Sequence, residues 1–224
     1  MPEQSDAPAL CYLCGQPLVE PINDDHVPPR LFFAPSIRRA LNLSQLLTIR
    51  VHKSCNTSFR LDEEYFVYSL VPLALRSDAG RELYKHIREK FRRMQNRPLI
   101  AQILREFEPR PSGLVLPDGK VIKRFNPNRI ERVIWKLVRG LFFHHHKKTL
   151  PEELKLTWTL TGPDDGPPPE HFQAFTGNHP SYGQYPGALD YQFEAYPEMT
   201  PTGHYWALLF WDSIIVTVAF SHSV

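Results

Sequence analysis

The sequence predicts an α+β fold that begins with a small module holding all of its cysteines, continues through basic helices and ends in an antiparallel sheet. Three observations support this prediction. The three cysteines lie within the first 55 residues, and apolar residues recur at helical spacing in the middle of the chain. Residues 150–224 contain strand-like segments, and in one of them, residues 156–160, apolar and polar residues alternate as in a half-buried strand. We expect a module over residues 8–72 and an α+β accessory domain over residues 73–224.

The cysteine-containing module is expected to include a strand and a helix. Residues 46–51 form a brief run with β-branched residues, which favours a strand. Over residues 59–70, Phe59, Phe66 and Leu70 recur at helical spacing, and Pro72 ends the helix. The acidic triplet at residues 62–64 is interpreted as a solvated first turn that complements the helix dipole, with a second metal carboxylate as the alternative.

Two further helices and a set of strands account for most of the remaining chain. Residues 78–97 combine an apolar stripe with basic residues on the other faces, which predicts a basic amphipathic helix. Asp118-Gly119 predicts a hairpin turn, and residues 128–143 a second helix. The expected strands cover residues 154–161, 191–196, 204–211 and 213–220.

Charge is distributed unevenly along a chain whose net charge is only +2. Residues 1–149 hold 25 Lys and Arg against 15 Asp and Glu, a net charge of +10, whereas residues 150–224 hold one lysine against nine acidic residues, a net charge of −8. This pattern is typical of a chain that meets a polyanion with one side. The alternative is that charge simply varies along the chain.

Composition also bears on the compartment. No run of about 18 apolar residues occurs, and the first residues lack the basic and then apolar pattern of a signal peptide. We therefore expect a cytoplasmic protein without a membrane partner.

The cysteines belong to two pairs of metal-ligating residues, Cys11-x-x-Cys14 and His52-x-x-Cys55. A gap of two residues lets one tight turn direct both side chains at a single ion, and two such turns complete the tetrahedron that zinc accepts. The alternative is three small buried cysteines and an ordinary surface histidine. Because four protein ligands close the coordination shell, we expect a structural zinc, and a zinc-dependent hydrolase is disfavoured.

Residues suited to phosphodiester hydrolysis lie beside these pairs. Asp25-His26 stands between them, and Asn56 directly follows Cys55. Hydrolysis of a phosphodiester needs a base to activate water and a hard cation to hold the phosphate. Histidine suits the first task near neutral pH, and carboxylate and amide oxygens suit the second.

With these motifs, the chain resembles the HNH endonuclease superfamily of ββα-metal nucleases. The residues that carry the resemblance are Asp25-His26 and Cys55-Asn56. The finer pattern of Cys-x-x-Cys, Asp-His-Val-Pro-Pro and His-x-x-Cys-Asn is similar to a bacterial subgroup of uncharacterised HNH proteins. The resemblance covers residues 10–67.

The resemblance implies a zinc-stapled ββα-metal module that acts as a metal-dependent endonuclease with nucleic acid, and specifically DNA, as its substrate. It implies that His26 is the general base, and that Asp25 and Asn56 bind one catalytic Mg²⁺ or Mn²⁺ ion. The middle asparagine of the family has no counterpart, because residues 47–49 are Leu, Thr and Ile. The alternative function is a non-catalytic zinc-containing module that binds nucleic acid or protein.

Basic residues within the module are candidates for contact with nucleic-acid phosphates, which attract positive charge without reading sequence. Each one alone is more typical of a solvated side chain, but as a group they indicate phosphate contact. They are Arg30, Arg38, Arg39, Arg50 and Lys53.

Overall fold

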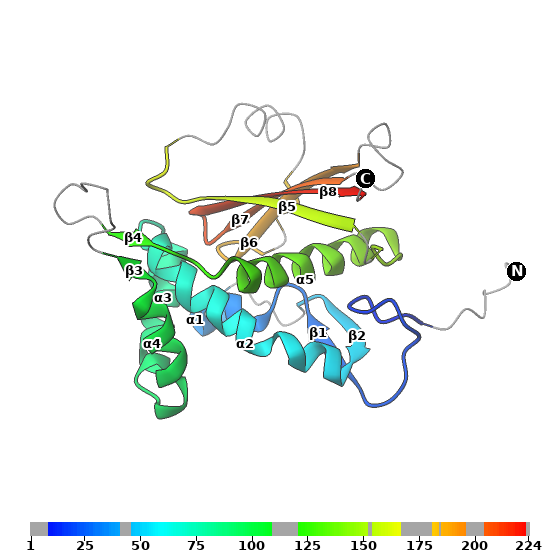
Figure 1. Cartoon of the computed structure of the whole chain (residues 1–224), viewed down its shortest axis with the longest axis horizontal. Coiled ribbons are helices and arrows are strands. Elements are labelled where there is room, and N and C mark those ends of the chain that lie inside the picture. Colours follow the sequence, from blue (N-terminus) through cyan, green and yellow to red (C-terminus); the bar gives the residue numbers. More distant parts are fainter. Residues whose placement is uncertain are drawn as a thin grey trace, which may run out of the picture.

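The computed structural model describes residues 9–40, 46–108, 121–151, 154–166, 181–183, 185–195 and 204–222. Figure 1 shows helix α5 (Pro127–His146) between a four-stranded sheet on one side and the N-terminal elements on the other. The N-terminal elements include strands β1 (Ile22–His26) and β2 (Thr48–His52) and helix α2 (Lys53–Leu70), of which α2 packs on α5. The predicted α+β class with an antiparallel sheet is confirmed.

Strands β1 and β2 form an antiparallel pair, and α2 starts directly after β2. In their register Asp25 lies opposite Ile49, and His26 lies opposite Thr48. Because α2 starts at Lys53, the acidic triplet at residues 62–64 lies in the middle of the helix. The interpretation of this triplet as a solvated first turn was wrong, since all three side chains are half-buried and form ion pairs.

The basic segment at residues 78–97 is interrupted. Helix α3 (Asp78–Phe91) ends before a short 3-10 turn (Met94–Asn96), and helix α4 (Arg97–Arg105) then begins. The side-chain amide of Asn96 donates to the carbonyl of Lys90 at 2.8 Å, so the side chain caps the end of α3 together with the backbone amide of Arg93, which donates to the same carbonyl at 3.1 Å. Pro98 stands in the first turn of α4, where a missing N–H has no cost.

The sheet has the strand order β5-β8-β7-β6, and every neighbouring pair is antiparallel. Its inner face packs on α5, where the ring centroids of Trp135 and Phe220 are 5.2 Å apart. The strands are β5 (Leu154–Thr161), β6 (Leu189–Ala195), β7 (His204–Phe210) and β8 (Ile214–His222).

Shorter elements complete the described chain. Strands β3 (Phe107–Glu108) and β4 (Ile122–Lys123) pair with each other, and the expected turn at Asp118-Gly119 lies outside the described residues. The others are η1 (Arg30–Phe32), α1 (Pro35–Ala40) and η2 (Val71–Ala74).

One hydrophobic core crosses the expected domain boundary at residue 72. The Phe66 ring stacks on Phe32 at 5.4 Å and meets Phe210 of β7 edge-on at 5.2 Å. The indole N–H of Trp211, in the turn between β7 and β8, donates to the carbonyl of Phe32 at 3.0 Å. The division into two domains stays a prediction. Within the described ranges, every helix is too short or too polar to span a lipid bilayer.

Gly140 lies where α5 closely approaches Val27 and Tyr12, and its replacement provides a test of this packing. A Cβ atom at residue 140 would lie 2.7 Å from Cγ2 of Val27. We expect Gly140→Val to destabilise the protein by about 1–3 kcal/mol through overpacking, and to lower its melting temperature by about 2–12 °C. The control is Gly162→Val, because a Cβ there meets only the flexible carboxylate of Asp165, at 3.2 Å. Equal melting temperatures for the two variants would contradict this account.

Candidate metal and catalytic site

The structure brings the two predicted ligand pairs together. One ligand atom from each of Cys11, Cys14, His52 and Cys55 lies within 4.8 Å of all the others. The Nδ1 atom of His52 is 3.4 Å from the sulfur of Cys14 and 3.8 Å from that of Cys55. A tetrahedral zinc with Zn–S distances of about 2.3 Å would hold its sulfur ligands roughly 3.8 Å apart. The donor set and its spacing therefore fit zinc, and the prediction that these four residues come together as a group able to hold one metal ion is confirmed.

Local backbone structure aims these side chains. The amides of Cys11 and Gly15 donate to the carbonyls of Gln16 and Cys11, each at 2.8 Å, which closes the first ligand pair into a tight turn. Gly15 has a φ of 69°, a left-handed conformation that glycine adopts without steric cost. The second pair spans the junction between β2 and α2, so His52 and Cys55 are separated by about one helical turn.

Without a metal ion, the surroundings of the cluster disfavour the thiolate form of Cys55. Burial is the main cause, and the neighbouring thiols of Cys14 and Cys11 add to it, so that the pKa of Cys55 rises to about 12. A metal ion reverses this preference by binding the thiolates. The Nε2 atom of His52 is 3.0 Å from the carbonyl oxygen of Pro17 and 3.2 Å from the amide nitrogen of Val19. With a metal on Nδ1, Nε2 carries the proton and donates to Pro17.

A second constellation surrounds the buried carboxylate of Asp25, which is only 4% exposed. The hydroxyl of Tyr12 donates to its Oδ2 at 2.5 Å, and Nζ of Lys136 donates to its Oδ1 at 2.8 Å. The same Nζ donates to Oδ1 of Asn56 at 3.2 Å. An oxygen of Asp25 on β1 and an oxygen of Asn56 on α2 therefore reach the same ammonium group. The prediction that Asp25 and Asn56 share one metal ion requires such a meeting of the two oxygens.

Lys136 also donates to Oε1 of Glu63 at 2.5 Å. Burial raises the pKa of Glu63, and the neighbouring ammonium opposes this effect. Carboxylate and amide oxygens are what a hard divalent ion requires, so the chemistry of Asp25 and Asn56 fits Mg²⁺ or Mn²⁺. The ammonium group of Lys136 lies where these two oxygens meet. A divalent ion could therefore bind both oxygens only if the side chain of Lys136 moved away.

His26 ends β1 and is half-buried next to this constellation. Its pKa is lowered below the usual value of 6.5, first by burial and next by the positive charge of Arg30. Asp25 acts in the opposite direction and Lys136 in the same direction as Arg30, each more weakly. The imidazole is therefore mostly neutral at pH 7, the form that can accept a proton.

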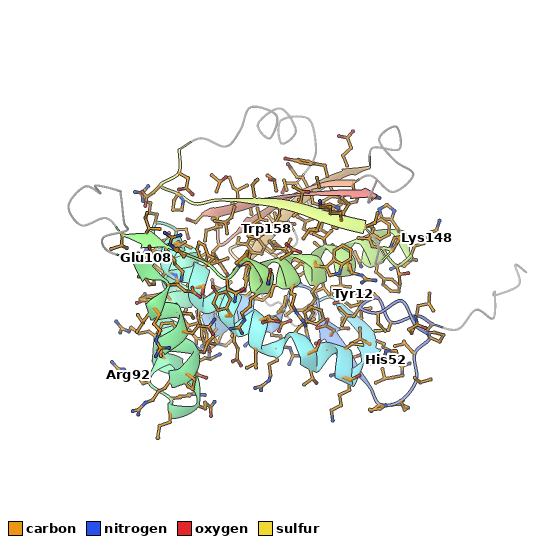
Figure 2. All side chains as sticks on the ribbon, viewed as in Figure 1. Tyr12, His52, Arg92, Glu108, Lys148 and Trp158 are labelled. Carbon is orange, nitrogen blue, oxygen red and sulfur yellow. The ribbon has the colours of Figure 1, made fainter. Side chains whose placement is uncertain are left out.

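The five residues that were predicted to contact phosphate lie in different surroundings. Arg38 is half-buried beside α3, where its charge contributes to lowering the pKa values of His86 and Lys90. Figure 2 shows Arg92, at the end of α3, far from His52, so the basic surface of α3 lies away from the cluster. The other four are exposed: Arg30, Arg39, Arg50 and Lys53. Within the described part of the chain, none of the five forms an ion pair.

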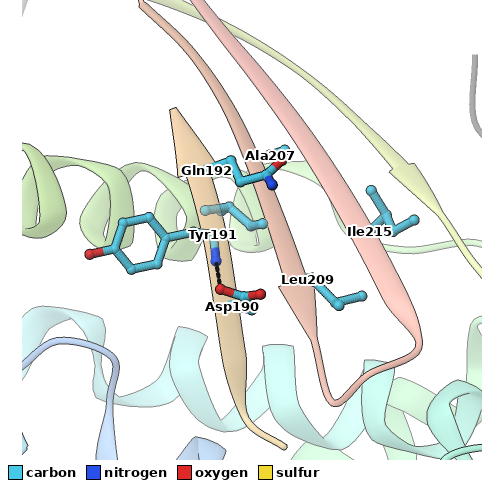
Figure 3. A pocket seen from close by; sticks show the side chains of 7 residues that line it. Asp190, Tyr191, Gln192, Ala207, Leu209 and Ile215 are labelled. Atoms are coloured by element: carbon cyan, nitrogen blue, oxygen red, sulfur yellow. Dashed lines mark hydrogen bonds between the residues drawn. The ribbon is translucent and has the colours of Figure 1, made fainter. Parts of the chain in front are cut away.

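A separate cavity of about 240 Å³ lies on the sheet, over β6, β7 and β8 (Figure 3). Ala207, Leu209 and Ile215 give it an apolar lining, and Asp190 is its single carboxylate. None of the candidate metal-ligating or catalytic residues lines this cavity.

Comparison of the chain with protein-family models, with curated proteins and with solved structures gives no match. The resemblance to HNH endonucleases therefore depends on the motif residues alone.

The zinc cluster can be tested by removing its only histidine. We expect His52→Ala to lose the stoichiometric zinc of the wild-type protein and to lower its melting temperature by roughly 6–12 °C, because the metal stabilises the folded module by about 3 kcal/mol or more. Metal content is measured by inductively coupled plasma mass spectrometry. His86→Ala is the matched control, since His86 is partly buried on α3 and belongs to no such cluster. Retention of one zinc per chain in His52→Ala would refute the assignment.

Proposed function

We propose that this chain is a metal-dependent endonuclease of the HNH type that hydrolyses phosphodiester bonds in nucleic acid, with DNA as the expected substrate. The observation that supports the proposal is that oxygens of Asp25 and Asn56 meet at one point, next to a mostly neutral His26. That point is marked by the ammonium nitrogen of Lys136, 2.8 Å from Asp25 and 3.2 Å from Asn56. The zinc cluster adds support, since it fixes the helical turn that carries Asn56.

In this proposal each residue has one task. His26 accepts a proton from the attacking water, a contribution of about 10²–10⁴ in rate for a general base. Asp25 and Asn56 hold a Mg²⁺ or Mn²⁺ ion, which when bound stabilises negative charge on the scissile phosphate. Tyr12 orients Asp25 through its hydrogen bond to Oδ2. The exposed Arg30, close enough to influence His26, is well placed to attract a phosphate.

A non-catalytic zinc module that binds nucleic acid or protein is the second candidate. One observation favours it: Lys136 donates to Asp25, Asn56 and Glu63, and these three contacts use all the donors of an ammonium group. Such a module would bind zinc and its partner without cleaving nucleic acid.

Plasmid cleavage distinguishes the two candidates. We expect the zinc-loaded protein to nick supercoiled plasmid with Mg²⁺ or Mn²⁺, and His26→Ala to lower the rate at least about 100-fold while it retains its zinc, because the variant lacks the base. His86→Ala serves as the control and should cleave at the wild-type rate. Wild-type activity in His26→Ala would remove the base from the mechanism, and no cleavage by any protein would favour the non-catalytic module.

The pH dependence of cleavage gives an independent test of His26. The base works only when neutral, and its pKa lies below 6.5, so the rate should be level near pH 7 and should fall only at more acidic pH. Removing the positive charge of Arg30 should raise that pKa, so the acidic limb of the rate profile should move to higher pH in Arg30→Gln. An unchanged or oppositely shifted limb would contradict the assignment.

A further inference from the structure

Lys136 occupies the centre of the candidate catalytic site although it comes from α5. Its partners Asp25, Asn56 and Glu63 lie 111, 80 and 73 residues away in the sequence. All three hydrogen bonds end on side-chain oxygens, and the distances from Nζ are 2.5–3.2 Å. The ammonium therefore takes the place and the oxygen ligands that a divalent cation would use.

The surroundings of Lys136 hold its side chain there. The side chain is 1% exposed, and the ring of Phe59 lies 5.5 Å from Nζ. Gly140, one helical turn further along α5, allows the helix backbone to approach Val27 and Tyr12 closely. Lysine is almost never fully buried unless it is paired, so this position is a built feature of the site.

We infer that Lys136 is an internal cation that competes with a divalent metal ion for Asp25 and Asn56, so that the metal site is closed until the ammonium moves away. This inference rests on the proposed function, because the catalytic metal is part of that function. Two cations cannot share the same oxygens without strong repulsion, and an ammonium with three donors in use has none left for a phosphate. Glu63 is the partner that can keep the ammonium when Asp25 and Asn56 bind a metal.

The charges of the site favour a divalent ion as well as the ammonium group of Lys136. Asp25 and Glu63 bring two carboxylates into the site, whereas Lys136 brings one positive charge. A divalent ion is therefore attracted to the site, but it must displace a cation that is already there. The wild-type protein should bind the metal weakly, and loss of the lysine charge should strengthen binding.

The test measures Mn²⁺ binding to the zinc-loaded full-length chain by the loss of the free-ion signal in electron paramagnetic resonance. We expect Lys136→Met to bind one Mn²⁺ about 10- to 100-fold more tightly than wild type, the range typical of coupling between sites. Lys136→Arg keeps the positive charge and should show no such gain. Lys123→Met is the matched control, because Lys123 is also a buried lysine, with its Nζ 2.8 Å from Glu106. Adding Asp25→Asn to Lys136→Met should abolish the gain.

Equal Mn²⁺ affinity in wild type and Lys136→Met would overturn the inference, as would an equal gain in Lys123→Met. Lys136→Met leaves two carboxylates without their cation, so its melting temperature is measured with and without Mn²⁺. Stabilisation by Mn²⁺ is the expected result, and a variant that fails to fold even with Mn²⁺ would also overturn the inference. Failure of the proposed function gives a different outcome: no protein cleaves plasmid, whatever its affinity for Mn²⁺.

Discussion

The buried contact of Lys136 with Asp25 is the interaction on which the arrangement of the site depends. It joins α5 to β1, and the further contacts of Lys136 with Asn56 and Glu63 join α5 to α2. Loss of one partner from a buried pair costs about 3–5 kcal/mol, because the other charge remains buried without compensation. Exposed ion pairs, by comparison, contribute roughly 0–1 kcal/mol each. The buried network therefore outweighs the surface ion pairs in fixing where α5 lies.

Two constraints act on Asn56 from different directions. Cys55 belongs to the zinc cluster, so a bound metal would fix the first turn of α2 against β2. The amide oxygen of Asn56 is meanwhile bonded to Lys136, and its amide nitrogen lies 3.4 Å from the side-chain oxygen of Asn23 on β1. The cluster and the ammonium group thus position the same residue through the backbone and through the side chain. This explains how an oxygen from α2 and one from β1 reach the same ammonium group.

The sequence was informative where chemistry is local. A gap of two residues constrains both side chains of a ligand pair, so Cys11, Cys14, His52 and Cys55 could be assigned to one cluster. The four strands of the sheet were also located to within a few residues, and in β5 the alternation over residues 156–160 marks a half-buried strand. The start of α2 was misplaced because residues 53–58 carry few apolar side chains that mark a buried face. The break before Arg97 was missed because it depends on a side-chain cap, although Pro98 was a visible signal.

The role of Lys136 could not be found in the same way. Its helix was predicted, and residue 136 lies within the predicted range, but its partners are at least 73 residues away and meet it only through tertiary packing. A lysine in a helix is ordinarily read as solvated, since its charge is costly to bury. Gly140 was the nearest local signal, because a glycine inside a helix costs about 1 kcal/mol relative to alanine and so suggests a packing reason.

Under the proposed function, the difference in exposure across the site suggests a direction of approach for a nucleic-acid phosphate. Asp25 and Lys136 are buried, whereas His26 and Asn56 are half-buried and Arg30 is exposed. A phosphate that arrives from solvent would meet Arg30 and His26 before it could reach the oxygens of Asp25. The negative charge of that phosphate would add to the two carboxylates, and a single ammonium could not balance all three. A nucleic acid bound at this surface would therefore increase the demand for further positive charge at Asp25 and Asn56, which is the condition under which a divalent ion competes best with Lys136.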